Sequence, residues 1–338
     1  MDSIPFFRRR RNIEEYGKED YRKYVDLVGS QRVLAIKLTM KVTGFSFIKN
    51  AVTYDFPIVE AIKSILPICD DFVVAVGESE DDTMDLISQI DPGKIRIIET
   101  QWDESLREGG RVLALETDKA FANISEDSDW AFYIQGDEVV HEKYLELIYE
   151  AMLKFKDDTS IDGLLFKYLH FYGSWDYVGA SSKWYKHEIR VVRNDKSIYS
   201  YRDAQGFRKG NNEKLRVQAI GACMYHYGWV KEPETMQSKL ESNSKLWHND
   251  QWIEDHIRTA DNVYNYEHHV NELKLFSGEH PQVMKDRIQA KNWKFDYDIS
   301  HNRKTIKDKL KEFLHKNFGL DFSYKNYRIA TQQGKKNI

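Results

Sequence analysis

An acidic turn follows an apolar run near the middle of the chain. Residues 130–134 are all apolar, as in a buried strand, and the turn after them consists of Gln135, Gly136, Asp137 and Glu138. Parallel sheets bind ligands at the carboxyl ends of their strands, which makes Asp137 a candidate site residue. Carboxylates hold divalent cations that keep water and phosphate oxygens as further ligands, and Gly136 lets a diphosphate approach the backbone. The turn predicts a metal site for a phosphate-bearing ligand, with an ordinary strand end as the alternative.

A second polar turn follows the apolar residues 72–76. It runs from Gly77 to Thr83, contains Glu78 and Asp81, and precedes an expected helix. The free N–H groups at a helix start attract anions or accept a polar cap, so Glu78 and Asp81 are candidates for contacts with a base or a ribose. An ordinary helix cap by Asp81 or its neighbour is the alternative.

The elements that must position these turns alternate along the chain. Strands are expected at residues 42–48, 72–76, 95–99 and 130–135, and helices at 57–66, 83–90, 111–123 and 141–155. Such alternation is typical of right-handed βαβ units around a mostly parallel sheet. Further strands are expected at 163–171 and 188–193, and mostly helical segments at 232–262 and 281–318. The expected fold class is therefore α/β with a C-terminal helical elaboration.

Composition excludes several classes of protein. The 338 residues are 41% hydrophobic and carry a net charge of -4 with dispersed basic residues, which argues against a nucleic-acid partner. Cys69 and Cys223 lie far apart in apolar segments, so we expect no disulfide framework and infer a reducing, cytoplasmic compartment. No apolar run approaches the roughly 18 residues of a membrane span, and the N-terminus lacks the order of a secretory signal.

Three segments are expected. Residues 1–39 are charged and weakly periodic, and we interpret them as a leader or accessory segment before a main domain at 40–230 and a mostly helical extension at 231–338. A chain that begins at Met40 is expected to keep its ligand binding. The basic run at residues 8–11 is explained by solvation more simply than by acidic lipid, and peripheral contact with the inner face of a membrane stays open.

The order of the polar turns resembles that of the GT-A fold glycosyltransferases, in particular their family 2. In that family a first strand ends in a polar residue, matched here near Asn50, and a second precedes a Ser-x-Asp-x-Thr turn, matched by residues 79–83. A later strand ends in an Asp-x-Asp metal motif, matched by residues 135–138. The resemblance covers about residues 41–230. It implies a Rossmann-like nucleotide-diphospho-sugar transferase fold.

The resemblance also implies an activity. Family 2 enzymes are metal-dependent inverting transferases that use Mn²⁺ or Mg²⁺ and a nucleotide-sugar donor. The similarity to bacterial surface-polysaccharide enzymes suggests a saccharide or lipid-linked saccharide acceptor. Two departures bear on this expectation: Gln135 replaces the first Asp of the metal motif, and Gly77 and Glu78 stand where an Asp often ends the second strand. Asp137 is then the expected metal ligand, while Gln135 can accept a hydrogen bond from ribose or metal-bound water.

The resemblance assigns roles to further residues. His226 lies where many GT-A enzymes supply a histidine to the metal or the diphosphate, although a structural histidine among aromatics is the alternative. Inversion needs a carboxylate base, and Asp203 is the first candidate and Glu188 the second, each with ion pairing to a nearby arginine as the alternative role. The expected donor-binding residues are Asn50, Glu78, Asp81, Arg107, Arg111 and Gln135, and the expected acceptor-binding residues are Trp184, His187 and Arg208.

Two other functions remain open from the sequence. A sugar-1-phosphate nucleotidyltransferase also uses an α/β sheet and carboxylate-bound magnesium, but it usually has a Gly-rich basic loop after the first strand, where this chain has Lys49, Asn50, Ala51 and Val52. A non-catalytic saccharide-binding or nucleotide-sugar-binding protein is the third possibility, because Gln135 alters the metal motif.

Overall fold

The computed structural model describes residues 40–258, 261–270, 272–302 and 325–330, together with residues 309, 313–314 and 317. The chain divides into two compact units, Met1–Met40 and Lys41–Ile338. The leader expected at residues 1–39 lies outside the described residues, and the account below concerns the second unit. The division at residues 230 and 231 stays a prediction.

The first half of this unit alternates strands and helices as expected. Its strands are β1 (Val42–Ile48), β2 (Asp71–Gly77), β3 (Ile95–Thr100) and β4 (Trp130–Tyr133), and its helices are α3 (Ile58–Ile65), η3 (Leu66–Ile68), α4 (Thr83–Ser88) and α5 (Arg111–Ala122). β1 pairs in parallel with both β2 and β4, and β3 extends this parallel sheet beyond β2. The carboxyl ends of β1, β2 and β4 therefore lie at one edge of the sheet.

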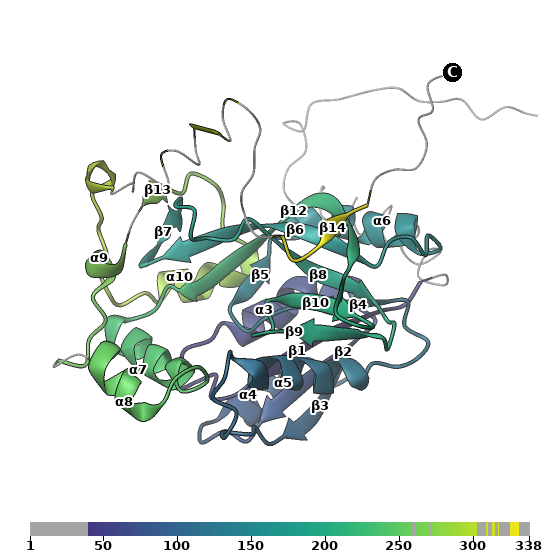
Figure 1. Ribbon diagram of the computed structural model, residues 1–338, viewed down its shortest axis with the longest axis horizontal. Coiled ribbons are helices and arrows are strands. Elements are labelled where there is room, and N and C mark those ends of the chain that lie inside the picture. The colour runs from purple at the N-terminus through teal and green to yellow at the C-terminus, as the bar shows by residue number, and fades with distance from the viewer. Residues whose placement is uncertain are drawn as a thin grey trace, which may run out of the picture. The chain divides into compact units, whose positions relative to one another are not determined.

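The second half continues the same sheet with mostly antiparallel strands. It contains β5 (Glu138–Val140), η4 (Glu142–Tyr144), α6 (Leu145–Phe155), β6 (Gly163–Tyr172), β7 (Ser174–Gly179), β8 (His187–Arg193) and β12 (Arg216–Trp229). β8 pairs antiparallel with β4 and with β6, and β12 pairs with β5 and β6 (Figure 1). The fold class is α/β, as expected.

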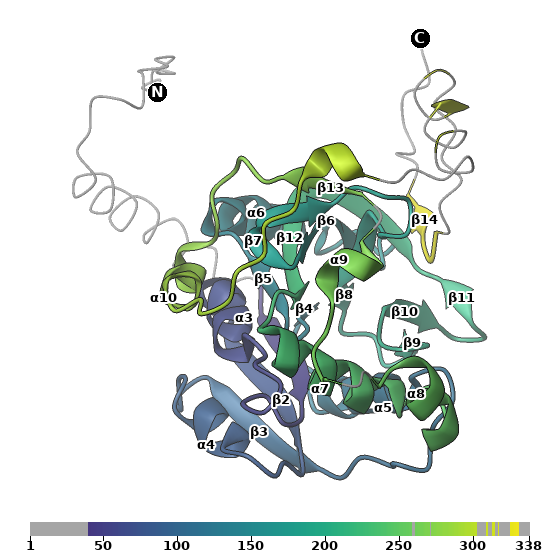
Figure 2. The same cartoon turned by 90° about the vertical axis from the view of Figure 1, so that its left-hand side faces the viewer.

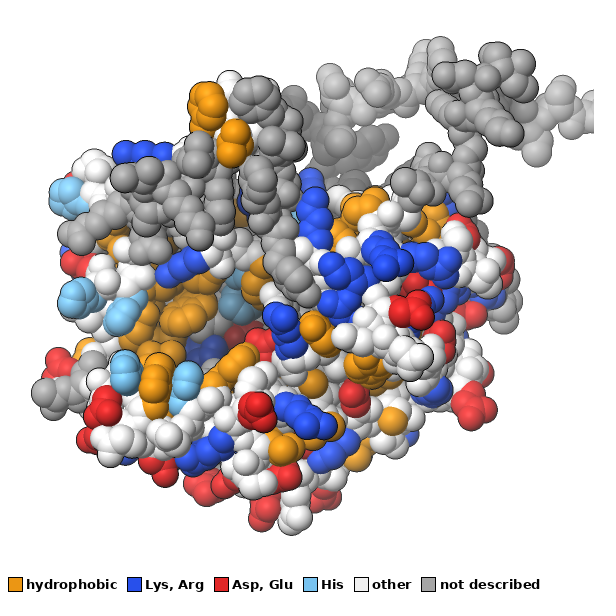
Figure 3. All heavy atoms as spheres, viewed as in Figure 1, with side chains coloured by type: hydrophobic (Ala, Val, Ile, Leu, Met, Phe, Trp, Pro, Cys, Tyr) orange, Lys and Arg blue, Asp and Glu red, His pale blue; other side chains and the backbone are white. Residues whose placement is uncertain are grey.

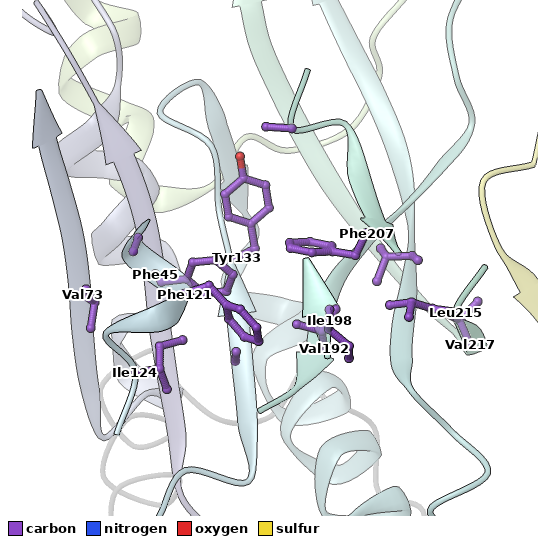
Figure 4. Close-up of a cluster of buried hydrophobic side chains, with 14 of the residues drawn as sticks. Phe45, Val73, Phe121, Ile124, Tyr133, Val192, Ile198, Phe207, Leu215 and Val217 are labelled. Atoms are coloured by element: carbon purple, nitrogen blue, oxygen red, sulfur yellow. The ribbon is translucent and has the colours of Figure 1, made fainter. Parts of the chain in front are cut away.

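A small sheet packs over the core of the large one. β9 (Ile198–Tyr201), β10 (Gly206–Lys209) and β11 (Glu213–Lys214) form it, and β9 contacts α5. Phe207 of β10 lies against Tyr133 with ring centroids 5.5 Å apart, and Tyr133 lies 5.2 Å from Phe45 (Figure 4). These buried rings fix the hairpin, and with it the loop at residues 202–205, above the end of β4.

The described C-terminal residues form short helices and two short strands, and residues 303–308, 310–312, 315–316 and 318 of the expected helical segment 281–318 lie outside the described residues. It contains α7 (Pro233–Ser244), α8 (Asp250–His256), α9 (Tyr266–His269), β13 (Leu273–Leu275), η5 (Gln282–Met284), α10 (Lys285–Gln289), η6 (Ile299–His301) and β14 (Arg328–Ile329). α10 lies beside α3, where Arg287 pairs with Glu60 at 3.2 Å (Figure 2). Among the described residues, no helix is long and apolar enough to cross a bilayer.

Residues 291–298, expected to be helical, form neither helix nor strand. Trp293, Phe295 and Tyr297 alternate with exposed residues, which is the period of a strand and not of a helix. The Trp293 indole N–H donates to the Gly173 carbonyl at 2.8 Å, and the Phe295 ring fills the space where Gly173 has no side chain. Burial of this aromatic face outweighs the helix propensity of the segment.

Candidate functional site

A pocket of about 810 Å³ opens at the carboxyl ends of β1 and β4. Six of the residues expected at the site line it: Asn50, Arg107, Gln135, Asp137, Asp203 and His226. Residues 242, 243 and 245–247, at the end of α7 and just after it, form another part of the lining. On the face shown in Figure 3, hydrophobic and histidine side chains gather over the region of α7, α8 and α9.

Strand register brings Asp137 and two histidines together. His226 of β12 is paired with Glu138 of β5 on one side and with His170 of β6 on the other. The Asp137 carbonyl accepts a hydrogen bond from the Tyr227 N–H at 2.8 Å, which fixes the turn against β12. Residues far apart in sequence are thus neighbours on adjacent strands of the sheet.

Asp137 and His226 face each other across Gly228. The Asp137 Oδ1 and His226 Nε2 atoms are 3.7 Å apart, and the two side chains are 13% and 12% exposed. A Cβ atom at Gly228 would lie 2.6 Å from Asp137 Oδ2 and 2.9 Å from His226 Nε2. Only glycine leaves room for both groups, so the backbone of β12 helps to shape this corner of the pocket.

A hydrogen-bond relay fixes the proton of His226. His170 Nε2 lies 2.9 Å from the Tyr185 carbonyl, an acceptor, so this nitrogen carries the proton. Burial lowers the pKa of His170 to about 3, and its Nδ1 is then bare and accepts from His226 Nδ1 at 3.3 Å. Neutral His226 therefore presents the lone pair of Nε2 toward Asp137.

Positive charge keeps Asp137 ionised. Burial by itself would raise the pKa of Asp137, but the positive charge of Lys239 holds that pKa well below its ordinary value. The Lys239 Nζ atom is 3.1 Å from Asp137 Oδ2. For His226, burial lowers the pKa despite the opposing charge of Asp137.

The next carboxylate, Glu138, has a structural role. It is fully buried and receives two hydrogen bonds from Arg190, from Nε at 2.8 Å and from Nη2 at 2.7 Å. The Tyr168 hydroxyl donates a third at 2.7 Å. Arg190 Nη1 also donates to the Gln205 carbonyl at 3.0 Å, which ties the hairpin loop to the acidic turn.

Gln135 holds the same loop from another side. Its amide Nε2 donates to the Ala204 carbonyl at 3.1 Å and to the Tyr133 hydroxyl at 3.3 Å. The hydrogen bonds from Arg190 and Gln135 together fix the loop at residues 202–205, and this loop places Asp203 in the lining of the pocket. Burial raises the pKa of Asp203 above its ordinary value, which makes the carboxylate more basic.

The expected donor residues other than Arg111 are divided between two pockets. Glu78 and Asp81 line a separate space of about 470 Å³ beyond the end of β2. Asp81 accepts from the Thr53 N–H at 2.7 Å and from the Thr83 N–H at 3.0 Å, so it holds together the turns after β1 and β2. Asn50 lines the main pocket, and its Oδ1 accepts from the Glu80 N–H at 2.9 Å.

The remaining expected residues, apart from Arg107, lie outside the lining of the main pocket. Arg107 lines it and pairs with Asp250 at 2.7 Å, whereas Arg111 is exposed at the start of α5 and is not part of the lining. Other positions also lie outside it: Glu188 and Arg208 are buried, the Trp184 ring stacks on His170 at 5.0 Å, and His187 is half-buried in β8. These roles stay predictions.

Sequence reasoning missed three residues that shape the site. Lys239 contacts Asp137, His170 orients His226, and the Trp102 ring covers Gly77 at the end of β2, where a Cβ atom would lie 2.5 Å from the indole nitrogen. The aromatic residues around His170, at 168–172, are typical of a strand but do not single it out. Nothing local marks Lys239, because its partner is 102 positions away.

Comparisons with known proteins yield structural likenesses only. No family model and no curated protein matches the chain. TarS from S. aureus matches 60% of this chain and 39% of its own at 14% identity and a TM-score of 0.36. Glucosyl-3-phosphoglycerate synthase from Mycobacterium tuberculosis, solved with Mn²⁺ and UDP, matches 41% of this chain and 47% of its own at 20% identity and a TM-score of 0.28.

A third likeness is to 4-diphosphocytidyl-2C-methyl-D-erythritol synthase from Anaerococcus prevotii. It covers 61% of this chain and 97% of that one, at 11% identity and a TM-score of 0.34. This chain spans less than half of the length of TarS and of the glucosyl synthase. At these identities and scores the likenesses concern parts of the fold and carry no argument about activity.

Proposed function

We propose that this protein is a glycosyltransferase that uses a nucleotide-sugar donor and a divalent cation. One observation carries the proposal: the lone pair of His226 Nε2 and the ionised Asp137 Oδ1 face each other at 3.7 Å. Two electron-rich atoms at this separation repel unless a cation, or a proton from water, lies between them. They line a pocket at the carboxyl ends of parallel strands, large enough for a nucleotide.

The residues present fit Mn²⁺ or Mg²⁺. Asp137 and His226 would hold the ion, with a carboxylate oxygen and an imidazole nitrogen as ligands. No group of three or more His, Cys, Asp or Glu side chains that could hold a metal occurs among the described residues. Two protein ligands suit an ion that takes its remaining ligands from water and the donor diphosphate. When bound, the ion supplies positive charge to the leaving nucleoside diphosphate.

The chain's own residues would then carry out the transfer. Asp203 accepts the proton of the acceptor hydroxyl, and the acceptor oxygen forms a bond to the anomeric carbon. The bond from that carbon to the diphosphate breaks, and its electron pair leaves with the nucleoside diphosphate. Attack on the face opposite the leaving group inverts the anomeric centre. Arg107 also lines the pocket and is the arginine proposed to bind the phosphates of the donor.

The acceptor is a saccharide or a lipid-linked saccharide, as in enzymes that build surface polysaccharides. Tyr185 lines the pocket, and Trp184 next to it is half-buried against His170 and Trp229. Aromatic rings of this kind stack on the apolar faces of sugars. Trp184 is the proposed acceptor contact, and His187 and Arg208 are proposed as further acceptor-side residues.

The test begins with binding. Nucleotide sugars with different bases are screened for a rise in melting temperature with and without Mn²⁺, because a ligand of the native state stabilises it. With the best donor, Asp137→Ala should abolish the turnover that Mn²⁺ stimulates. Retention of near-normal turnover in a folded Asp137→Ala variant would exclude the assigned site.

A second experiment examines the metal directly. Gly228→Ala places a methyl group between the two ligands and should weaken Mn²⁺ binding, measured by electron paramagnetic resonance, without unfolding the protein. Gly93→Ala is the matched control, since a Cβ there meets only Asp91 Oδ1 at 3.4 Å. Equal Mn²⁺ affinity in both variants would contradict the proposed ligands.

A further inference from the structure

Lys239 brings an ammonium group to the corner of the pocket formed by Asp137 and His226. It belongs to α7, the helix that follows the His226 strand, and its side chain is 10% exposed. The Nζ atom donates to Asp137 Oδ2 at 3.1 Å and to the Gly228 carbonyl at 2.9 Å. Lys239 also lines the pocket, so the ammonium group lies at its wall.

The ammonium group of Lys239 lies over an aromatic ring, which helps to hold it in place. The Nζ of Lys239 lies 4.7 Å from the centre of the Phe56 ring, and that of Lys231 lies 4.8 Å from the same centre. Lys231 is fully buried and donates to the Asp55 carbonyl. An ammonium group has three N–H donors, and two of those of Lys239 are used within the described part of the chain. The third is available for a ligand oxygen.

The acidic turn brings one carboxylate, Asp137, into the pocket, and Lys239 already pairs with it. Position 135, where the Asp-x-Asp motif has its first Asp, carries a glutamine amide that donates to the Ala204 carbonyl. A diphosphate that enters the pocket meets an ammonium group already in position.

We infer that Lys239 is a binding residue for the donor diphosphate, and that it supports nucleotide binding without a divalent cation. The inference rests on the proposed function. It identifies Lys239 as a side chain that, together with the metal, offsets the negative charge of the donor diphosphate. With metal present, Asp137 coordinates the ion and Lys239 bonds to phosphate oxygen. Without metal, Lys239 remains the counter-charge of the diphosphate, although Asp137 competes for it.

Calorimetry with nucleoside diphosphates on the full chain tests the inference. UDP, GDP, ADP, CDP and dTDP are titrated with Mn²⁺ and with EDTA, and the best ligand is expected to bind in both conditions. In EDTA, Lys239→Met should lose about ten- to a hundredfold in affinity, the usual effect of a lost charge-assisted hydrogen bond, and Lys239→Arg should retain most of it. Lys154→Met is the matched control, because Lys154 also lies over a ring, that of Phe155, and is outside the pocket.

Asp137→Asn should change the affinity for the nucleoside diphosphate in opposite directions in EDTA and in Mn²⁺. It frees Lys239 and removes a negative charge, so affinity for the nucleoside diphosphate in EDTA should rise, while affinity in Mn²⁺ should fall. Wild-type binding that needs Mn²⁺ would overturn the inference and leave the proposed function intact. Binding in neither condition would overturn both. If Lys239→Met does not fold, Asp137→Asn and Lys239→Arg decide, and a fall in EDTA affinity for Asp137→Asn contradicts the inference.

Discussion

Two carboxylates of one pocket have opposite electrostatic surroundings. Lys239 and neighbouring charges lower the pKa of Asp137 despite its burial, whereas burial raises the pKa of Asp203. A permanently ionised carboxylate suits a cation, and a more basic one suits proton transfer. The different roles proposed for these residues therefore follow from their surroundings, since both are aspartates.

The role of Asp203 leads to a kinetic prediction. Asp203→Asn keeps the size of the side chain and removes its basicity, so turnover should fall by about a hundred- to ten-thousandfold while donor affinity barely changes. Since the base acts when deprotonated, wild-type turnover should rise with pH through a pKa above the ordinary aspartate value. Normal turnover in Asp203→Asn would move the role to Glu188, and a parallel loss of donor affinity would make Asp203 a binding residue.

Glu188 gives a prediction about stability. Burial raises its pKa to about 8, and its Oε2 has no hydrogen-bond partner among the described residues. The folded state holds this proton more tightly than the unfolded state, so stability should fall as pH rises from about 4.5 to 8, by on the order of a few kcal/mol. Urea unfolding of the wild type and of Glu188→Gln checks this. The prediction fails if the variant shows the same pH dependence as the wild type.

At the scale of elements, one buried ion pair joins three of them. Glu138 begins β5, Arg190 belongs to β8, and Nη1 of Arg190 holds the loop between β9 and β10. Arg190→Met leaves a buried carboxylate without its partner and should lower the free energy of unfolding by about 3–5 kcal/mol. Chemical unfolding measures it. The double variant with Glu138→Leu should recover part of the loss, and a loss below about 1 kcal/mol in Arg190→Met would contradict the structural role.

Local patterns predicted the elements of the first half well. β1 has the expected bounds, the helix that begins at Arg111 ends one residue before the expected end, and the turn after β4 carries Asp137 into the pocket. The same patterns could not give the register of β12 with β5 and β6, because strand pairing depends on residues far apart in sequence. For that reason the partners of Asp137 other than His226 were missed, and Glu138 could not be recognised as structural.

At the scale of the whole molecule, the described site belongs to the unit Lys41–Ile338. The described residues that line the main pocket all lie in the range from Phe47 to Trp247. A chain of residues 40–338 should therefore keep its affinity for the nucleotide sugar within about threefold, measured by calorimetry beside the full chain. Insolubility of the shorter chain, or lost binding, would place residues 1–39 within the folded core.

The central claim is that the pocket at Asp137 transfers a sugar from a nucleotide. Phosphorus NMR of the reaction with the best-binding donor tests it most directly, because it identifies which bond breaks. A glycosyltransferase releases the nucleoside diphosphate, and Asp137→Ala should stop that release when Mn²⁺ is present. Formation of sugar 1-phosphate from the donor and added pyrophosphate would instead reveal a nucleotidyltransferase, and an unchanged donor spectrum with every acceptor supplied would contradict catalysis at this site.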